Sequence, residues 1–414
     1  MINVHDEFAV LIGLDWANKK HDVCLQKTDE STRHFEVIQS SPEAIEDWIQ
    51  GIYKRVKGRI AVALELDKGP IVYALQKYSY VTIFPVHPLM LAKYRQVFSP
   101  SGAKDDPTDA ELALDMMLKY PNKIKPLSVP CSEMRKLRHL VEQRRTLVDD
   151  KRRLANRLIN SLKQYYPQPL DWFSHRDTDL FCEFICRWPT LQKVKRAHEA
   201  TVCRFFLSKG GNATPKIEQR IIAIKQAIPL TNDRGVIESH QLLVMTLASQ
   251  IQLLIKAIRN FDKEIDSLFE SMEDSYLFKS LPGVGPCLGP RLLVAFGDDR
   301  NRFDNAGQVQ NYTGIAPVTE RSGQKAWIHW RWQCAKFLRQ TFIEWAAKTV
   351  KTSYWAGLYY EKQRNKGNSH QSTIRALAFK WIRIVFRCWK SRTVYDESKY
   401  LKALRERNSP LIIT

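Results

Sequence analysis

The chain has 414 residues, of which 64 are Lys or Arg and 44 are Asp or Glu, so its formal net charge is +20. A hydrophobic share of 44% is typical of folded proteins and excludes a disordered basic tail. The length predicts two or three domains. The charge favours nucleic acid as a partner, with an anionic membrane surface a distant second.

The amino-terminal sequence lacks the charged start, long apolar core and small-residue cleavage site of a secretory signal. No run of about eighteen apolar residues stands out, so we expect no membrane span and no membrane partner. The eight cysteines are scattered, and the closest pair, Cys182 and Cys186, matches neither a zinc knuckle nor a redox motif. These features predict a cytoplasmic protein with reduced thiols.

Short apolar runs alternate with helical patterns in the first ninety or so residues. Strand-like runs occupy residues 8–17, 21–27, 33–39, 59–66 and 81–87, and helical periodicity occupies residues 41–56 and 69–78. Three strands followed by helix, strand, helix and strand predict an α/β layer with a partly antiparallel sheet.

A long basic helix is predicted from about residue 131 to about residue 163. A stripe of leucines marks its apolar side, and arginines occupy the other faces: Arg144, Arg145, Arg152, Arg153 and Arg157. Such a surface favours binding to an RNA duplex or to a DNA backbone, and the alternative is a merely solvated basic helix. Mixed helix and loop follow over residues 165–235.

A heptad pattern then runs from Leu247 to Leu268, with apolar residues at alternating steps of four and three. It predicts either an amphipathic helix packed within its own chain or a coiled coil, between chains or as a hairpin. In both cases the segment is a spacer.

The sequence "SLPGVGPCLGPRLLVAFGD" opens a third region. Gly283 and Gly285 lie in a turn before a helix, where backbone N–H groups can face a phosphate. An ordinary turn between helices is the alternative.

Aromatic and basic residues interleave further on, in "KAWIHWRW". Lys325 and Arg331 lie among three tryptophans, a pattern that suits stacking on unpaired bases and clamping of a backbone. A core strand with basic neighbours explains the pattern equally well.

Four acidic residues stand out in the amino-terminal region. Asp15 and Glu65 end apolar strands, and Asp106 and Asp109 share one face at the start of a helix. Alone, the helical pair would be N-terminal acids favoured by the helix dipole. If the strands are neighbours, the four carboxylates converge at one sheet edge and favour Mg²⁺ or Mn²⁺, because these ions prefer oxygen ligands. Two such ions would suit phosphodiester chemistry.

This order of acids resembles the RuvC-like ribonuclease H fold. More closely, the chain resembles the DEDD transposases of bacterial insertion sequences, the insertion-sequence one-ten family, which includes bridge-RNA-guided recombinases and pilin-gene invertases. The resemblance rests on Gly13-Leu14-Asp15, on Glu65, and on the K-x-D-x-x-D-A pattern of residues 104–110. A second match lies in the "LPGVGP" turn and in "FDNAGQVQNYTGIAPVTERSGQK", which ends near Ser322-Gly323. Asp105 falls outside the matching set.

The resemblance implies a fold in three parts. These are a RuvC-like DEDD domain over residues 1–125, a basic helical and coiled-coil region over residues 126–275, and a mainly helical domain with a helix-hairpin-helix over residues 276–414.

The resemblance also implies a function. Ser322 would be the nucleophile that forms a covalent phosphoserine link to DNA, while Asp15, Glu65, Asp106 and Asp109 hold metal. Without the resemblance, Ser322 would be an ordinary turn serine. Further implied are a bridge or guide RNA, a homodimer or homotetramer, and a nucleoid-associated bacterial location. The alternatives are a RuvC-like metal-dependent endonuclease that uses water, a fixed-site DNA invertase without RNA, and a non-catalytic nucleic-acid-binding protein.

Overall fold

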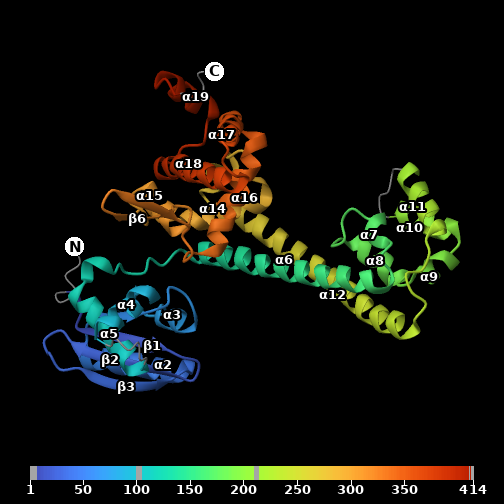
Figure 1. Ribbon diagram of the computed structural model, residues 1–414. Helices are drawn as coiled ribbons and strands as arrows, with labels where there is room; N and C mark the ends of the chain where they lie inside the picture. Colours follow the sequence, from blue (N-terminus) through green and yellow to red (C-terminus); the bar gives the residue numbers. More distant parts are fainter. Residues whose placement is uncertain (1–6, 99–104, 209–213, 410, 412–414) are drawn as a thin grey trace. The chain divides into compact units, whose positions relative to one another are not determined.

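The computed structural model describes residues 7–98, 105–208, 214–409 and 411. The chain divides into two compact units, Met1–Val129 and Pro130–Thr414 (Figure 1). The first is a mixed α/β unit, and the described part of the second is helical apart from a two-stranded hairpin. The division falls just before the predicted basic helix.

The sheet of the first unit has the strand order β3-β2-β1-β4-β5. Its strands span Val10–Trp16 (β1), Lys20–Lys27 (β2), His34–Gln39 (β3), Ile60–Leu64 (β4) and Val81–Pro85 (β5). The first three pair antiparallel, whereas β4 and β5 extend the sheet from β1 in parallel. The partly antiparallel sheet predicted from the apolar runs is confirmed, and the topology is compatible with a ribonuclease H-like domain.

Helices cover both faces of this sheet. Helices α2 and α3 pack on one face and α4 and α5 on the other, because alternate strand residues point to opposite sides. The helices span Pro42–Val56 (α2), Pro70–Leu75 (α3), Pro88–Phe98 (α4) and Asp106–Lys119 (α5), followed by the 3-10 turn Pro121–Lys123 (η1).

Gly13 brings the backbone of α5 into direct contact with β1. A Cβ atom at residue 13 would lie 1.9 Å from the carbonyl oxygen of Ala110 and 2.7 Å from the backbone nitrogen of Leu114. Any side chain would therefore push the helix off the strand. The glycine thus fixes the first half of α5 over β1, two residues from Asp15.

Two long helices, α6 (Ser132–Tyr165) and α12 (Arg234–Ser271), form the frame of the second unit. They run antiparallel, since Lys136 pairs with Glu264 at 3.6 Å and Ser161 contacts His240 at 2.8 Å. The apolar residues of the heptad pattern, including the buried Leu247, line the cores that α12 shares with α6. The structure therefore shows α12 packed against α6 within its own chain, and a coiled-coil geometry for this helix stays a prediction.

The chain between these helices forms a small helical core at one end of the pair. Its helices span Pro169–Trp172 (α7), Asp179–Arg187 (α8), Leu191–Arg196 (α9), Glu199–Ser208 (α10) and Thr214–Gln226 (α11). Aromatic side chains fill its centre, with Phe184 in contact with Trp188, Phe205 and Phe206. The described residues between 165 and 235 therefore fold as one cluster of short helices.

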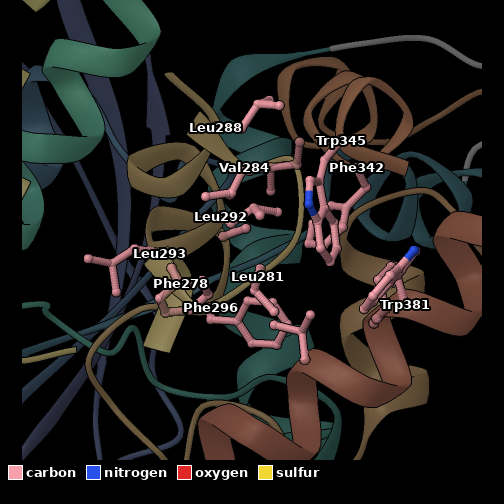
Figure 2. Packing of buried hydrophobic residues seen from close by; sticks show 14 of the residues in the cluster. Phe278, Leu281, Val284, Leu288, Leu292, Leu293, Phe296, Phe342, Trp345 and Trp381 are labelled. Atoms are coloured by element: carbon pink, nitrogen blue, oxygen red, sulfur yellow. The ribbon is translucent and has the colours of Figure 1, made fainter. Parts of the chain in front are cut away.

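The carboxyl-terminal residues build a larger core around the other end of α6 and α12. Its elements span Ser275–Lys279 (α13), Gly285–Phe296 (α14), Ala306–Tyr312 (α15), Val318–Ser322 (β6), Lys325–His329 (β7), Lys336–Thr352 (α16), Tyr354–Asn365 (α17), His370–Ser391 (α18) and Glu397–Glu406 (α19). Figure 2 shows Trp345 and Trp381 packed among its aliphatic and phenylalanine residues. Their ring centroids lie 4.9 Å apart.

The buried tryptophans of this core all have their indole N–H groups satisfied. Trp345 donates to the carbonyl of Pro282 at 2.9 Å, and Trp389 donates to the carbonyl of Gly297 at 3.0 Å. Trp381 donates to the hydroxyl of Thr349 at 2.8 Å. Buried tryptophan contributes a large apolar area only when its polar edge finds such a partner.

Helix α12 is long and apolar enough to cross a membrane by length and composition alone, with a mean hydropathy of 1.5 over its most apolar window. The sequence analysis expected no membrane span and did not identify this helix as a candidate. One face of α12 packs against α6 and α8, as expected of a helix that contributes to a protein core. A single helix of this kind is weak support for a span.

Candidate functional site

Asp15 and Glu65 follow equivalent positions on two neighbouring parallel strands. Leu14 of β1 pairs with Leu64 of β4, and parallel partners lie about 4.8 Å apart. Asp15 and Glu65 are the next residues along each strand, and both are half-buried. Alternation places them on the face that packs against α5. The predicted meeting of these two acids at one sheet edge follows from this register.

Helix α5 supplies the other two predicted acids from its first turn. Asp106 is half-buried, and Asp109 is only 2% exposed. Asp109 directly precedes Ala110, the residue that rests on Gly13. A solvated N-terminal acid would not be buried, so the simple capping interpretation does not account for Asp109. Lys104 of the sequence motif lies outside the described residues.

Asp109 is held by an arginine from the neighbouring helix α4. The Nε and Nη2 atoms of Arg95 lie 2.6 Å and 2.5 Å from Oδ1 of Asp109. Both side chains are largely shielded from solvent. Within the described residues, the side chains of Glu65 and Asp106 have no hydrogen-bond or ion-pair partner.

The donor set fits a hard divalent cation in its chemistry, since it offers carboxylate oxygens at one sheet edge. Among the described residues, however, no three acidic, histidine or cysteine side chains are close enough together to hold a metal ion. Arg95 occupies one oxygen of Asp109 in this arrangement. A cation bound by the full set would therefore either share the Asp109 carboxylate with Arg95 or displace the arginine.

Asp22 is an acid at this edge that the sequence analysis missed. It is 3% exposed and lies directly opposite Asp15 across the antiparallel β1–β2 pair, with Nζ of Lys20 at 3.4 Å. Opposite residues of such a pair share a face, and like charges there are destabilising. A carboxylate beside the apolar residues Val23 and Cys24 was the available signal.

Asp115, two turns further along α5, is a buried carboxylate with a different role. It accepts hydrogen bonds from Arg33 at 2.7 Å and Tyr94 at 2.5 Å, and it pairs with Lys119 at 2.8 Å. Burial opposes ionisation, but the hydrogen bonds from Lys119, Tyr94 and Arg33 keep the pKa of Asp115 below its usual range. Asp115 thus anchors α5 and is satisfied without a metal.

Ser322 lies at the tip of the β6–β7 hairpin in the second unit. It pairs with Lys325 across a two-residue turn whose first residue, Gly323, has φ of +57°. Glycine at that position is typical of a type II′ hairpin turn. Ser322 is exposed, and its hydroxyl makes no hydrogen bond within the described residues. The hairpin presents the serine to solvent without a base of its own.

The aromatic and basic stripe divides between the hairpin and the core. Trp327 lies on the exposed hairpin, and Trp332 beyond it is 78% exposed, so both rings are accessible. Lys325 is exposed beside Ser322. Arg331 turns back to the protein, donating to the carbonyl of Ala316 at 3.1 Å. The alternative of a buried core strand does not hold for β7.

The arginines of α6 fall into two groups. Arg144 pairs with Asp262 of α12, and Arg145 pairs with Asp149 at 3.1 Å and Glu344 at 3.5 Å, so both link elements within the unit. Arg152, Arg153 and Arg157 are exposed, the first two with local aspartate partners on the same helix. The second group forms the accessible basic surface of the helix.

The two glycines of the "LPGVGP" turn have different surroundings. Gly283 has φ of +68°, and a Cβ atom there would lie 2.7 Å from Oγ1 of Thr352. Gly285 has φ of +54° but faces open space. Gly283 therefore serves packing against α16, whereas Gly285 leaves the start of α14 open to a ligand.

Two family models match separate parts of the chain. A DEDD transposase model of the IS110 type, described as "Transposase", matches residues 12–167. A model described as "Transposase IS116/IS110/IS902 family" matches residues 275–361. The first match contains the four acids and the second contains Ser322.

Curated relatives align over nearly the whole chain. The "Mini-circle putative transposase for IS117" of Streptomyces coelicolor is 27% identical, with 95% of this chain and 97% of the relative covered. The "Insertion element IS116 uncharacterized 44.8 kDa protein" of Streptomyces clavuligerus is 24% identical, with 94% and 96% covered. The "Insertion element IS900 uncharacterized 42 kDa protein" of Mycobacterium paratuberculosis is 22% identical, with 93% and 97% covered.

Proposed function

The chain belongs to the IS110 family of transposases, and from that premise we propose that it cleaves and rejoins DNA strands through a covalent phosphoserine at Ser322. As a DNA transposase it acts on DNA. The observation that carries the proposal is the shared strand end of Asp15 and Glu65 on the sheet face that packs against α5. Such a carboxylate edge suits metal-assisted phosphodiester chemistry.

The first step is attack by Oγ of Ser322 on a phosphorus atom of the DNA backbone. The new Ser–O–P bond replaces a P–O bond to deoxyribose, and the hydroxyl proton is transferred through solvent or a base to the leaving oxygen. The reverse reaction with another strand's hydroxyl releases the serine and completes strand exchange. A serine hydroxyl needs activation to react in this way, and none is available within its own hairpin.

Asp15, Glu65, Asp106 and Asp109 would hold Mg²⁺ or Mn²⁺, and the family to which the chain belongs suggests use of a divalent metal. The metal would supply charge stabilisation at the attacking and leaving oxygens. The acids would hold it and orient the phosphate. Asp22 would add a further oxygen at the same edge.

The proposal includes a bridge RNA and assembly as a homodimer or homotetramer in the bacterial nucleoid. The exposed arginines of α6, with Arg157 unpaired among the described residues, offer a basic surface for a nucleic-acid backbone. The three-part division at residues 125 and 275, the helix-hairpin-helix around Gly283 and a coiled-coil role for α12 belong to the same proposal.

A hydrolytic RuvC-like endonuclease is the second candidate, because the hydroxyl of Ser322 has no activating partner on its hairpin. The recombinase and the endonuclease are distinguished by measuring strand cleavage of a plasmid that carries the ends of the insertion element. Ser322→Ala abolishes cleavage in a recombinase and leaves it intact in a water-using nuclease. Thr319→Ala is the matched control, since Thr319 is an exposed hydroxyl residue on the same strand. Treatment with ribonuclease distinguishes a fixed-site invertase, which would remain active.

A further inference from the structure

Trp330, the residue after β7, is where arginines from two different helices meet. The guanidinium carbon of Arg375, on α18, lies 3.6 Å from the centroid of the Trp330 ring, and that of Arg339, on α16, lies 4.7 Å away. Nη1 of Arg339 also donates to the carbonyl of Arg331 at 3.0 Å. Two cationic side chains are therefore gathered at the base of the Ser322 hairpin.

This cluster has no carboxylate to balance it. Among the described residues, neither Arg339 nor Arg375 forms an ion pair, and the guanidinium of Arg375 donates no hydrogen bond. In the same unit, by contrast, Arg291 pairs with Glu344 at 2.7 Å and Arg300 pairs with Asp274 at 2.6 Å. Burial and the nearby charge of Arg339 lower the pKa of Arg375. The charged guanidinium of Arg375 would therefore be stabilised by an added anion, since no carboxylate among the described residues pairs with it.

The start of α16 has the same unmatched positive character. Its N-cap is Ala335, which provides no side-chain hydrogen bond, and its first turn contains no acid. Lys336 and Arg339 instead place positive charge near the end of the helix where the dipole is already positive, which is unfavourable. A bound anion would reverse this cost.

We propose that Arg339 and Arg375 bind a backbone phosphate of the DNA strand that Ser322 attacks. Trp330 holds the two guanidinium groups by cation–π contact, so that their N–H groups are presented together. Lys325 lies opposite Ser322 in the hairpin, and Trp330 follows it by five residues. At the rise of an extended strand, the distance along the chain from Lys325 to Trp330 is about 17 Å. A DNA strand rises about 3.4 Å for each nucleotide, so the bound phosphate lies roughly five nucleotides from the attacked bond.

DNA is favoured over RNA because the cluster and Ser322 belong to the same hairpin and its base. The assignment of the phosphate to the attacked strand rests on the proposed function, in which Ser322 attacks DNA. The binding of a phosphate does not require cleavage, so it is measured in a Ser322→Ala background in which no covalent link can form. Failure of Ser322 chemistry therefore leaves this test unaffected.

The experiment measures the affinity of the full chain for a short fluorescein-labelled DNA duplex over a range of salt concentrations. Arg375→Gln is expected to weaken binding about tenfold and to reduce the slope of log affinity against log salt by about one. Arg375→Lys keeps the charge and should keep the slope while losing part of the affinity. Arg405→Gln, an exposed charge change on α19, is the control and should leave the slope unchanged.

A salt slope for DNA that is unchanged by both Arg375→Gln and the double change R339Q/R375Q overturns the proposal. A reduced slope for an RNA duplex of the same sequence, with none for DNA, overturns the assignment to the DNA strand. Thermal unfolding checks the fold, which Arg375→Gln should preserve because it removes an unpaired cation. If that variant does not fold, a loss of affinity at constant slope in Arg375→Lys supports the proposal, and unchanged affinity contradicts it.

Discussion

Arg95 and Asp109 form a buried ion pair in which two guanidinium nitrogens, Nε and Nη2, contact a single carboxylate oxygen at 2.6 Å and 2.5 Å. A buried carboxylate is costly unless it is paired, and here the pair satisfies it without a metal. Asp109 is also a predicted metal ligand. We therefore predict that Arg95 and a divalent cation compete for this carboxylate.

Replacing Arg95 with alanine should expose this competition. Arg95→Ala removes the arginine from the buried carboxylate of Asp109, which should lower the free energy of unfolding of the first unit by about 3–5 kcal/mol in the presence of chelator. Mn²⁺ should recover more of the loss in this variant than it adds to the unaltered protein. Thermal unfolding with and without Mn²⁺ measures both effects.

Arg59→Ala is the control for that experiment. Arg59 pairs with Glu7 at 3.3 Å near the surface, so its loss should cost about 0–1 kcal/mol and should be insensitive to Mn²⁺. Equal responses to Mn²⁺ in the two variants would show that Arg95 does not compete for a metal ligand.

Gly13 should be intolerant of any side chain. Gly13→Ala places a methyl group 1.9 Å from the carbonyl oxygen of Ala110, so α5 must move off β1 and the stability of the first unit should fall by about 3 kcal/mol or more. Gly51→Ala in α2 meets no atom within 4 Å and should instead stabilise by about 0.5–1 kcal/mol. Chemical denaturation followed by circular dichroism compares them. A mild effect at Gly13 would contradict the close contact between α5 and β1.

Much of the first unit could be predicted from the sequence. Each strand lies within a short apolar run of the sequence. Asp15 and Glu65 stand out because acidic residues seldom end such runs. The shared edge follows from topology once β1 and β4 are neighbours. The partner of Asp109 could not be predicted, because Arg95 lies on a separate helix and no local pattern links the two residues.

The second unit was harder to predict for the same physical reason. The basic pattern of α6 gave no sign that Arg144 and Arg145 are tied to carboxylates on α12 and α16, far away in the sequence. The heptad pattern predicted that α12 has an apolar face, but it did not predict that α6 packs against this face. Any helix with an apolar face could pack there equally well. The sequence groups Trp330 with Trp327 and Trp332 and does not show that arginines from two later helices contact the Trp330 ring.

Asp22 should contribute to metal binding. Asp22→Asn removes a charge opposite Asp15 and should weaken the binding of Mn²⁺ about tenfold or more, as measured by calorimetry. Asp67→Asn, an exposed acid two residues after Glu65, should change the affinity little. If Asp67→Asn has the larger effect, then Asp67 rather than Asp22 belongs to the site.

The two turn glycines should separate stability from binding. Gly283→Ala introduces both a strained φ and a contact at 2.7 Å with Thr352, so it should destabilise the second unit by several kcal/mol. Gly285→Ala meets open space and should cost only about 1–2 kcal/mol for its left-handed backbone. If the start of α14 binds a phosphate, Gly285→Ala should also weaken DNA binding. Full DNA affinity in this variant would remove the turn from the interface.

The most direct test of the proposed chemistry is a covalent trap. Cells expressing the protein with its flanking DNA are denatured rapidly, the DNA is digested, and Ser322 is examined by mass spectrometry for an attached nucleotide. We expect a nucleotide on Ser322 that is absent in both Ser322→Ala and Asp106→Ala and is retained in Thr319→Ala. DNA breakage that requires Asp106 but leaves Ser322 unmodified would contradict it and identify water as the nucleophile.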